Sequence, residues 1–384
     1  MEQNLKINQI ISLTQKSNFG GGKYFGYNKE KFLGIIKITT NKKIAGYGET
    51  LVGVYSPKLF KINLAYISKF INKKNLYPAL DELNKLKRNK FFFDCGILKS
   101  IIAGIEIAIF DILAQANNVS HGLVIKNYFK QKTKLSNNVE IYASAGSIKS
   151  SLKDLKNDIN YAKKLNISTF KGRLAINKNT SKKINILKSE IDNFAVDLIA
   201  NTYEKNQNLN NLKSFLNNIK NTKPVWLEEI LNTDSLYEFK KIKKYGLPFS
   251  YGENYNTFTD FINLIEFYNF NFINPDLSHL SIFDFVSLNE YLNKKNYNKK
   301  IIIHCWGGAI NFIYSLYCAQ VFQKQVKLVE FPITESSFME KVYPNISIVK
   351  SRCFIDDKVK SFKDIIDTST LEKIKFSKLT FNFD

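Results

Sequence analysis

The sequence reads FAVDL at 194–198, VWLEE at 225–229, SYGEN at 250–254, INPDL at 273–277 and IIIHCWGG at 301–308. Each segment contains a short apolar run followed by a carboxylate or an imidazole, and these side chains are Asp197, Glu228, Glu253, Asp276 and His304. The last four follow one another at intervals of 25, 23 and 28 residues, about one strand-and-helix unit each time. This spacing predicts successive parallel strands whose C-terminal ends meet at the mouth of a β/α barrel, where active sites lie.

Three of the four carboxylates, Asp197, Glu228 and Glu253, would repel one another at a shared mouth unless a cation neutralised them. Hard oxygen ligands favour Mg²⁺ in near-octahedral geometry, so we expect a magnesium site formed by Asp197, Glu228 and Glu253. Two positions are ambiguous. Asn201 follows closely in VDLIAN and is an alternative first ligand, although an uncharged amide binds the metal more weakly. Glu229 is an alternative to Glu228, because neighbours on a strand point to opposite faces.

The rest of the chain divides into two predicted domains and a tail. Residues 1–130 read as an α+β domain, with a hairpin pattern in FLGIIKITT-NKK-IAGYGETLV and helical periodicity over 57–130. Residues 131–344 alternate strands with lysine-rich amphipathic segments, which indicates a parallel barrel. The tail, from about 345 to 384, is expected to return to the first domain. Barrel strands are predicted to begin near residues 139, 168, 194, 225, 248, 272, 300 and 326.

Composition narrows the classes of function. The formal net charge is +22, but lysine is spread along the whole chain without an arginine cluster or a nucleic-acid-binding motif, so we expect no nucleic-acid partner. The apolar stretch 91–113 carries Asp94, Lys99, Glu106 and Asp111, which makes it too charged to span a membrane. The four cysteines form no CxxC pair, and the N-terminus has no signal-peptide pattern. These features predict a cytoplasmic protein with reduced thiols and no membrane partner.

Rare residues are informative in a chain so rich in lysine. There are only three arginines and three histidines. Arg173 follows a predicted strand in KGR (171–173), where a guanidinium can bind a carboxylate with two hydrogen bonds. Lys171 lies two positions earlier and therefore points to the same side. The glycine-rich segment 19–27 lacks the Lys-Ser/Thr ending of a phosphate loop, so we expect a mobile loop over the barrel mouth instead.

The ordered set of segments resembles the enolase superfamily, and within it the mandelate racemase subgroup. ITTNKKIAGYGET (38–50) resembles the hairpin of the family's capping domain, and IIAGIEIAIFDILAQA (101–116) resembles its buried helix. KGR (171–173) stands where the family has a basic pair on the second barrel strand, and VEFP (329–332) supplies the acid of the eighth. The three acidic segments match the metal-ligand strands, and PD276 with H304CWGG matches the Asp–His dyad of the sixth and seventh strands.

The resemblance implies a modified TIM barrel, (β/α)7β, with an N-terminal α+β capping domain. It also implies Mg²⁺-assisted removal of the proton α to a carboxylate through an enediolate intermediate. The family register selects Glu228 rather than Glu229 as a ligand beside Asp197 and Glu253. His304, oriented by Asp276, is the expected general base and acid.

The remaining site residues have expected roles at the substrate. Lys171 and Arg173 are expected in catalysis, where they would bind the substrate and stabilise the charge that develops on it. Lys171 could instead titrate if the metal and Arg173 lower its pKa. Glu330 would donate a hydrogen bond to the substrate carboxylate, which requires a protonated acid. The sequence departs from the family in having Lys-x-Arg as its basic pair. A further departure is His279, which stands near a position where some relatives have lysine and has either a structural or a catalytic role.

We therefore expect a lyase that dehydrates an acid sugar to a 2-keto-3-deoxy acid. A single acid/base on one face suits loss of a β-hydroxyl, whereas racemisation needs a competent base on each face. Cycloisomerases of the superfamily use paired lysines on the second and sixth strands. The sixth strand here has Asp276 and no lysine, which argues against that reaction. A racemase or epimerase of a hydroxy acid is the enzymatic alternative, and a non-catalytic barrel is the second. Relatives are often dimers or octamers, so a homo-oligomer is expected.

Overall fold

The computed structural model describes most of the chain, and both the barrel and the smaller domain are defined in it. The glycine-rich segment 19–27, expected to form a loop over the mouth, lies outside the described residues. The described residues are 4–17, 31–52, 56–89, 95–146, 150–201, 208–298, 300–333, 346–356, 359–365 and 379–382.

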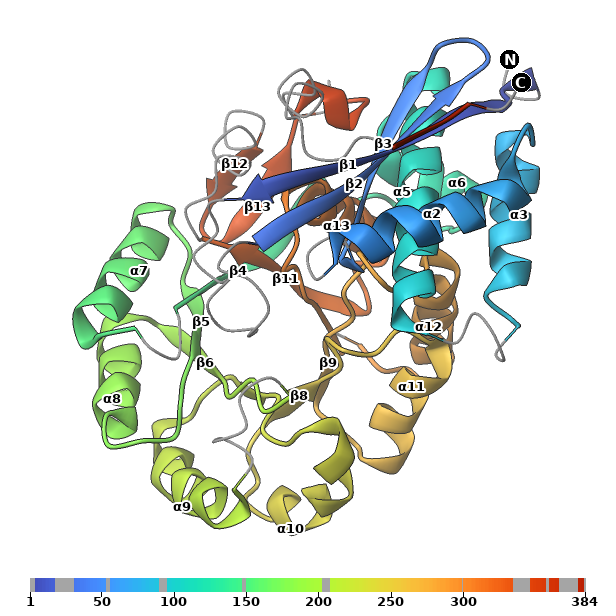
Figure 1. Ribbon diagram of the computed structural model, residues 1–384. Coiled ribbons are helices and arrows are strands. Elements are labelled where there is room, and N and C mark those ends of the chain that lie inside the picture. Colours follow the sequence, from blue (N-terminus) through green and yellow to red (C-terminus); the bar gives the residue numbers. More distant parts are fainter. Residues whose placement is uncertain are drawn as a thin grey trace.

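Eight parallel strands form a closed barrel in chain order (Figure 1). Each strand pairs with the next, and β11 closes the ring against β4 with Glu330 opposite Tyr142. The strands are short, apolar runs because both faces of a parallel barrel are buried. Their starting positions lie within one residue of those predicted, and the predicted fold class is confirmed. They are β4 (Asn138–Ala145), β5 (Thr169–Arg173), β6 (Asn193–Asp197), β7 (Trp226–Glu228), β8 (Phe249–Tyr251), β9 (Phe272–Ile273), β10 (Ile301–Ile303) and β11 (Val326–Pro332).

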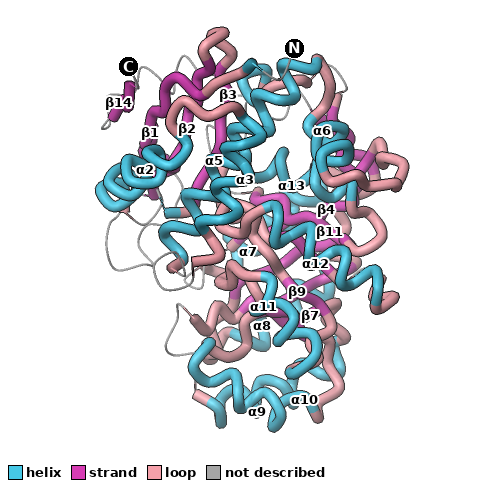
Figure 2. Tube along the Cα trace, turned by 90° about the vertical axis from the view of Figure 1, so that its right-hand side faces the viewer, coloured by secondary structure: helices cyan, strands magenta, loops and turns pink. Residues whose placement is uncertain are grey.

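Helical segments on the outside connect the strands (Figure 2). In the first of them, Ser151 and Asp154 form a capping box, and Leu155, Ile159 and Ala162 are buried along one face at helical spacing. The longer helices are α7 (Leu152–Lys164), α8 (Thr180–Glu190), α9 (Leu209–Ile219), α12 (Ile282–Lys294) and α13 (Ala309–Val321). Shorter pieces complete the other crossovers, namely η4 (Thr233–Glu238) with α10 (Phe239–Lys243), and α11 (Phe258–Ile262) with η5 (Asn263–Phe267).

An antiparallel sheet with its own helices packs against one side of the barrel (Figure 1). The helix α5 (Gly96–Asn117) lies close to β3, where a Cβ at Gly48 would clash with the carbonyl oxygen of Gly104. Glycine in the GYG segment therefore allows sheet and helix to approach. The sheet consists of β1 (Ile7–Ser17), β2 (Lys31–Thr40), β3 (Ala45–Thr50) and β14 (Leu379–Asn382). The other helices are α2 (Pro57–Ile71), α3 (Leu76–Leu86) and α6 (His121–Tyr128).

The C-terminal tail contacts both domains. Its first part does not go directly to the capping sheet, because β12 (Ile346–Val349) and β13 (Arg352–Ile355) extend the barrel sheet next to β4. Its last strand, β14, then lies beside β1 in both views (Figures 1 and 2).

A buried polar cluster fixes the tail to the capping domain. Asp111 accepts hydrogen bonds from the backbone N–H of Tyr47 at 2.9 Å and of Phe362 at 3.0 Å. His121 lies 2.9 Å from the same carboxylate and stacks on Tyr317. His121 thus joins α6 to the rest of the domain.

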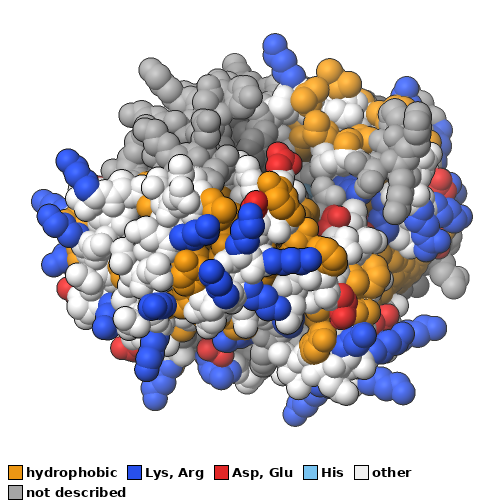
Figure 3. Space-filling view, turned by 90° about the horizontal axis from the view of Figure 1, so that it is seen from below, with side chains coloured by type: hydrophobic (Ala, Val, Ile, Leu, Met, Phe, Trp, Pro, Cys, Tyr) orange, Lys and Arg blue, Asp and Glu red, His pale blue; other side chains and the backbone are white. Residues whose placement is uncertain are grey.

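The surface agrees with the dispersed charge of the sequence. On the face seen in Figure 3, lysine and arginine side chains are scattered among neutral and apolar ones and form no single stripe over the described residues. No helix among the described residues is long and apolar enough to cross a membrane. Cys95 is exposed, whereas Cys305, Cys318 and Cys353 are buried free thiols.

Candidate active site

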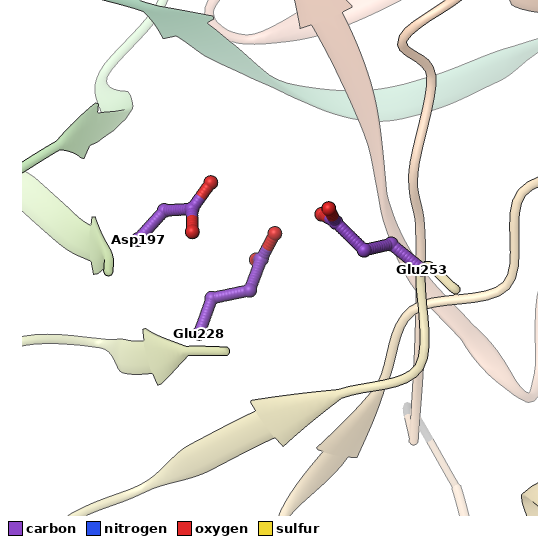
Figure 4. Close-up of side chains that lie close together, drawn as sticks. All are labelled: Asp197, Glu228 and Glu253. Carbon is purple, nitrogen blue, oxygen red and sulfur yellow. The ribbon is translucent and has the colours of Figure 1, made fainter. Parts of the chain in front are cut away.

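The carboxylates predicted to bind metal converge at the C-terminal mouth of the barrel. Asp197 ends β6 and Glu228 ends β7, and the two residues are paired in the parallel register. Glu253 follows two residues after β8. One ligand oxygen from each of the three lies within 4.8 Å of the others (Figure 4). Within the described chain, Oδ2 of Asp197 is buried and accepts no hydrogen bond, so it is available to a cation.

Two cations from β5 lie against these acids. The Nζ of Lys171 donates a hydrogen bond to Oε1 of Glu228 and lies 3.9 Å from Oδ2 of Asp197 and 3.4 Å from Oε1 of Glu330. The Nε of Arg173 is 3.5 Å from Oδ2 of Asp197. Burial lowers the pKa of Lys171, but the surrounding carboxylates, Glu228 first, outweigh it and raise the pKa well above its ordinary value. Beside these ionised carboxylates both side chains are cations.

Two cations do not balance the negative charge of the mouth. Burial, with the nearby charge of Glu228, raises the pKa of Asp197 to about 6 despite the opposing effect of Lys171. Burial and Glu229 raise the pKa of Glu253 well above its ordinary value. These shifts show that ionising every carboxylate is unfavourable here. Three clustered carboxylate ligands, two buried and one partly exposed, with excess negative charge fit a hard divalent cation.

The predicted Asp–His dyad is formed at the ends of β9 and β10. The Nδ1 of His304 is 2.7 Å from Oδ2 of Asp276, within the range of a strong hydrogen bond. The Nε2 of His304 faces the three-acid cluster, at 3.3 Å from Oε2 of Glu253, and lies 3.7 Å from Oε2 of Glu330. Burial lowers the pKa of His304, but Glu253, Glu330 and Asp276 outweigh it and raise the pKa to about 9.

Glu330 is an acceptor in this arrangement. Burial raises its pKa, but Lys171 and His304 outweigh burial and bring the pKa to about 2. Its Oε2 accepts hydrogen bonds from the hydroxyl of Tyr142 at 3.1 Å and from the backbone N–H of Cys305 at 3.2 Å. The sequence-based expectation required a protonated Glu330, whereas the cations around it favour the ionised carboxylate.

Three polar residues beneath the site were missed by sequence reasoning. Trp226 Nε1 and Asn274 Nδ2 donate to Oε2 of Glu228 at 2.8 and 3.1 Å, and Tyr142 donates to Glu330. Trp226 lies two positions before Glu228 on one strand, so the two-residue period could have placed it on the same face. Tyr142 and Asn274 give no comparable signal, because their contacts depend on neighbouring strands.

Comparison with solved structures places this architecture among known folds. A structure of an enolase from environmental shotgun sequencing of the Sargasso Sea matches with a TM-score of 0.82 and 18% identity, and the match covers 99% of each chain. An enolase superfamily member from Agrobacterium tumefaciens matches with a TM-score of 0.76 and 18% identity, covering 92% of this chain and 95% of the other. The chain has the fold of the enolase superfamily.

Proteins of different activities share the enolase superfamily fold. L-talarate/galactarate dehydratase from Salmonella typhimurium LT2 has a TM-score of 0.75 and 14% identity over 100% of this chain and 95% of its own. A mutant of that enzyme is described in complex with Mg and L-glucarate. The 3,6-anhydro-D-galactonate cycloisomerase from Zobellia galactanivorans has the same fold. No protein-family model and no curated protein sequence matches the chain. The fold alone therefore leaves the reaction open.

Asn201 and Glu229, the two alternative metal ligands considered from the sequence, make hydrogen bonds of their own. Asn201 Nδ2 donates to Oε1 of Glu229 at 2.5 Å and to the hydroxyl of Tyr251 at 2.9 Å. Glu229 has a φ of 43°, which turns the chain immediately after Glu228, and it also accepts a hydrogen bond from Asn254. The two alternative ligands thus bind each other, and Glu229 is not among the three acids of the cluster.

His279 is buried, and neither of its ring nitrogens has a hydrogen-bond partner among the described residues. It begins three residues after Asp276 and lies near the backbone of Tyr255 and Glu253. Burial lowers its pKa, so the imidazole is neutral.

Proposed function

We propose that this chain is an enzyme of the mandelate racemase subgroup of the enolase superfamily and that it dehydrates an acid sugar. The reaction removes the proton α to the carboxylate and expels the β-hydroxyl as water, giving an enol that becomes a 2-keto-3-deoxy acid. The observation that carries this proposal is the position of His304. Its Nδ1 is held by Asp276 while its Nε2 faces the cluster formed by Asp197, Glu228 and Glu253.

Asp197, Glu228 and Glu253 would hold Mg²⁺, which supplies a Lewis acid for the oxygens of the substrate carboxylate. The raised pKa of Glu253 supports this assignment. Within the described residues, Oδ2 of Asp197 also accepts no hydrogen bond, and the cations Arg173 and Lys171 approach it only to 3.5 and 3.9 Å. Oxygen ligands of this kind suit magnesium better than softer transition metals.

The substrate carboxylate would be bound by the two cations of β5. Lys171 and Arg173 lie beside the acids, and neighbouring carboxylates hold the pKa of each above its ordinary value. They would stabilise the negative charge that develops on the carboxylate oxygens when the α-proton leaves. The guanidinium of Arg173 is a poor base at neutral pH, so it is not suited to accept that proton.

His304 would move both protons of the reaction. In the neutral imidazole, the Nδ1–H donates to Asp276, so the lone pair of Nε2 is free to accept the α-proton. The same Nε2–H then protonates the β-hydroxyl. The C–O bond breaks, and the hydroxyl leaves as water with the electron pair of that bond. Glu253 and Glu330 raise the pKa of His304 and so favour its protonated form. Positive charge that offsets these carboxylates would lower the pKa and make the neutral, basic form accessible.

The competing reaction is racemisation or epimerisation, which needs a second base on the opposite face of the α-carbon. Arg173 stands beside the site, but the pKa of its guanidinium is raised and it cannot serve as a base at neutral pH. His304, held by Asp276, is an imidazole that can act as acid or base and faces the cluster from one side, which supports dehydration.

The test is a screen of acid sugars with Mg²⁺ for 2-keto products, comparing the wild type with His304→Asn. We expect one or a few sugar acids to react, and we expect the variant to lose several orders of magnitude in kcat while its circular dichroism is unchanged. A fully active His304→Asn would remove the proposed base. A wild type that binds no Mg²⁺ and turns over no sugar acid would indicate a non-catalytic barrel.

A further inference from the structure

A carboxylate of the capping domain reaches into the barrel at the start of α13. Glu49 on β3 is buried, and its side chain accepts hydrogen bonds from the backbone N–H of Gly308 and, at 3.1 Å, of Asn311. These are the N-cap and third residues of the helix, whose N–H groups have no partner within the helix itself. Gly308 offers no side chain to cap them, so Glu49 caps the helix from another domain.

The two glycines after His304 are explained by this contact. A Cβ at Gly307 would clash with the Glu49 carboxylate, and one at Gly308 would be crowded by it as well as by Leu33. The HCWGG segment is therefore shaped to admit Glu49. The strand end that carries His304 and the helix that follows it are thus fitted to the capping domain.

Asn311 links this contact to the dyad. Its backbone N–H binds Glu49, and its side-chain Nδ2 donates to Oδ1 of Asp276 at 3.1 Å. The other oxygen of Asp276 binds Nδ1 of His304 at 2.7 Å. An unbroken series of contacts therefore runs from the capping domain through the first turn of α13 to the imidazole. Asp276 and Asn311 are both fully buried, so solvent offers no substitute partners.

We propose that Glu49 is a positioning residue for His304. It fixes the first turn of α13, which aims the amide of Asn311 at Asp276 and so sets the orientation of the imidazole. The effect on catalysis rests on the proposed function, in which His304 is the base, whereas the effect on the imidazole does not. Docking of the capping domain and orientation of the base are linked as a result.

Glu106 provides a matched control within the same domain. It is a buried carboxylate on α5 that accepts hydrogen bonds from Ser281 Oγ at 2.9 Å and from the backbone N–H of Ile282 at 3.0 Å, at the start of α12. It caps a barrel helix from the capping domain in the same way. Within the described residues its hydrogen bonds go to Ser281 and Ile282 and not to Asp276 or Asn311, so its loss tests docking without the direct connection to the dyad.

The experiment compares Glu49→Gln, Asn311→Leu and their double variant with Glu106→Gln. Losing an outer contact of this kind costs about 10- to 100-fold in activity, so we expect each single variant to lower kcat about tenfold or more with KM nearly unchanged. Because both act through one series of contacts, the double variant should lose about as much as one single variant, not the product of two. Glu106→Gln should retain the wild-type kcat.

Nuclear magnetic resonance of the imidazoles tests the structural half without any reaction. The chain has three histidines, and His304→Asn assigns the signal of His304. We expect the low-field Nδ1 proton signal of His304 to shift or broaden in Glu49→Gln and in Asn311→Leu, and to stay unchanged in Glu106→Gln. This readout decides the positioning role even if the screen for sugar acids finds no substrate.

Either half can overturn the proposal. Unchanged His304 signals in both variants would contradict it, as would kcat losses no larger than that of Glu106→Gln. If Glu49→Gln fails to fold, Asn311→Leu decides, because it keeps the backbone N–H to Glu49 and removes only the amide contact with Asp276. Independent, multiplicative losses in the double variant would show that the two residues act separately.

Discussion

Replacing Asp276 by asparagine tests the dyad with almost no change in shape. Oδ1 of Asp276 accepts hydrogen bonds from the backbone N–H of Ser278 at 2.8 Å, from Ser278 Oγ at 2.7 Å and from Asn311 Nδ2 at 3.1 Å. Oδ2 faces His304 Nδ1 at 2.7 Å and the backbone N–H of Trp306 at 3.4 Å. An asparagine must place its NH₂ group at one of these two positions.

The donors around Oδ1 determine which position the NH₂ takes. An NH₂ there would meet the fixed N–H of Ser278 and the amide of Asn311, and each buried donor left unpaired costs about 1–3 kcal/mol. The NH₂ of Asp276→Asn therefore faces His304 Nδ1. An imidazole that accepts this hydrogen bond is protonated on Nε2, so the atom that faces the metal site can no longer accept a proton. The imidazolium also loses its carboxylate partner.

We expect Asp276→Asn to lower kcat by about 10³- to 10⁴-fold, the size of effect seen when a serine protease loses the equivalent carboxylate. This corresponds to about 4–5 kcal/mol in the activation free energy. KM should change little, because Asp276 does not face the substrate. The assay is the initial rate of 2-keto acid formation at saturating Mg²⁺, with thermal unfolding as the control for folding. A variant that keeps a tenth or more of the wild-type kcat would refute the assignment of His304 as an oriented base.

Three further outcomes follow from the charges of the site and of the domain interface. Arg173→Lys should lower kcat but keep the same 2-keto product, because the charge remains while the two-pronged contact is lost; a change of product would contradict this. Asp197→Asn should raise Tm without metal, because an ionised Asp197 with its pKa raised to about 6 destabilises the fold at neutral pH, and it should abolish the Tm increase caused by Mg²⁺; an unchanged metal response would exclude Asp197 as a ligand. Burial raises the pKa of Glu106 to about 7 from 4.5, so the folded state binds more protons than the unfolded state between these values and the wild type should lose roughly 3 kcal/mol relative to Glu106→Gln as the pH rises through that window. Parallel Tm profiles of the two proteins from pH 4.5 to 8 would show that burial does not raise the pKa of Glu106.

The barrel was predictable from the sequence because its signal is local and repeated. Each strand is an apolar run, and the interval of 23 to 28 residues fixes where the next one begins. The strand-end acids were predictable for the same reason, since parallel register brings Asp197 opposite Glu228. The path of the tail was only partly predictable, because β12 and β13 pair with β4 through contacts that no periodicity reports.

The electrostatics of the site could not be derived from residue types alone. Glu330 was expected to carry a proton, but its pKa depends on the distance to Lys171 Nζ, 3.4 Å, and on the position of His304. The role of Glu49 was equally hidden, because it lies more than 250 residues from Gly308 and Asn311 in sequence. The glycines of HCWGG gave a signal, but they could be interpreted only once the capping domain was in place.

The most direct test follows the α-proton of a reactive sugar acid in D₂O by proton NMR, with Mg²⁺ present. We predict that the α-proton signal disappears together with the appearance of a 2-keto-3-deoxy acid that carries solvent deuterium at C3, and that His304→Asn abolishes both changes. Exchange of the α-proton in substrates of both configurations without loss of water would contradict the dehydratase assignment and establish a racemase or epimerase instead.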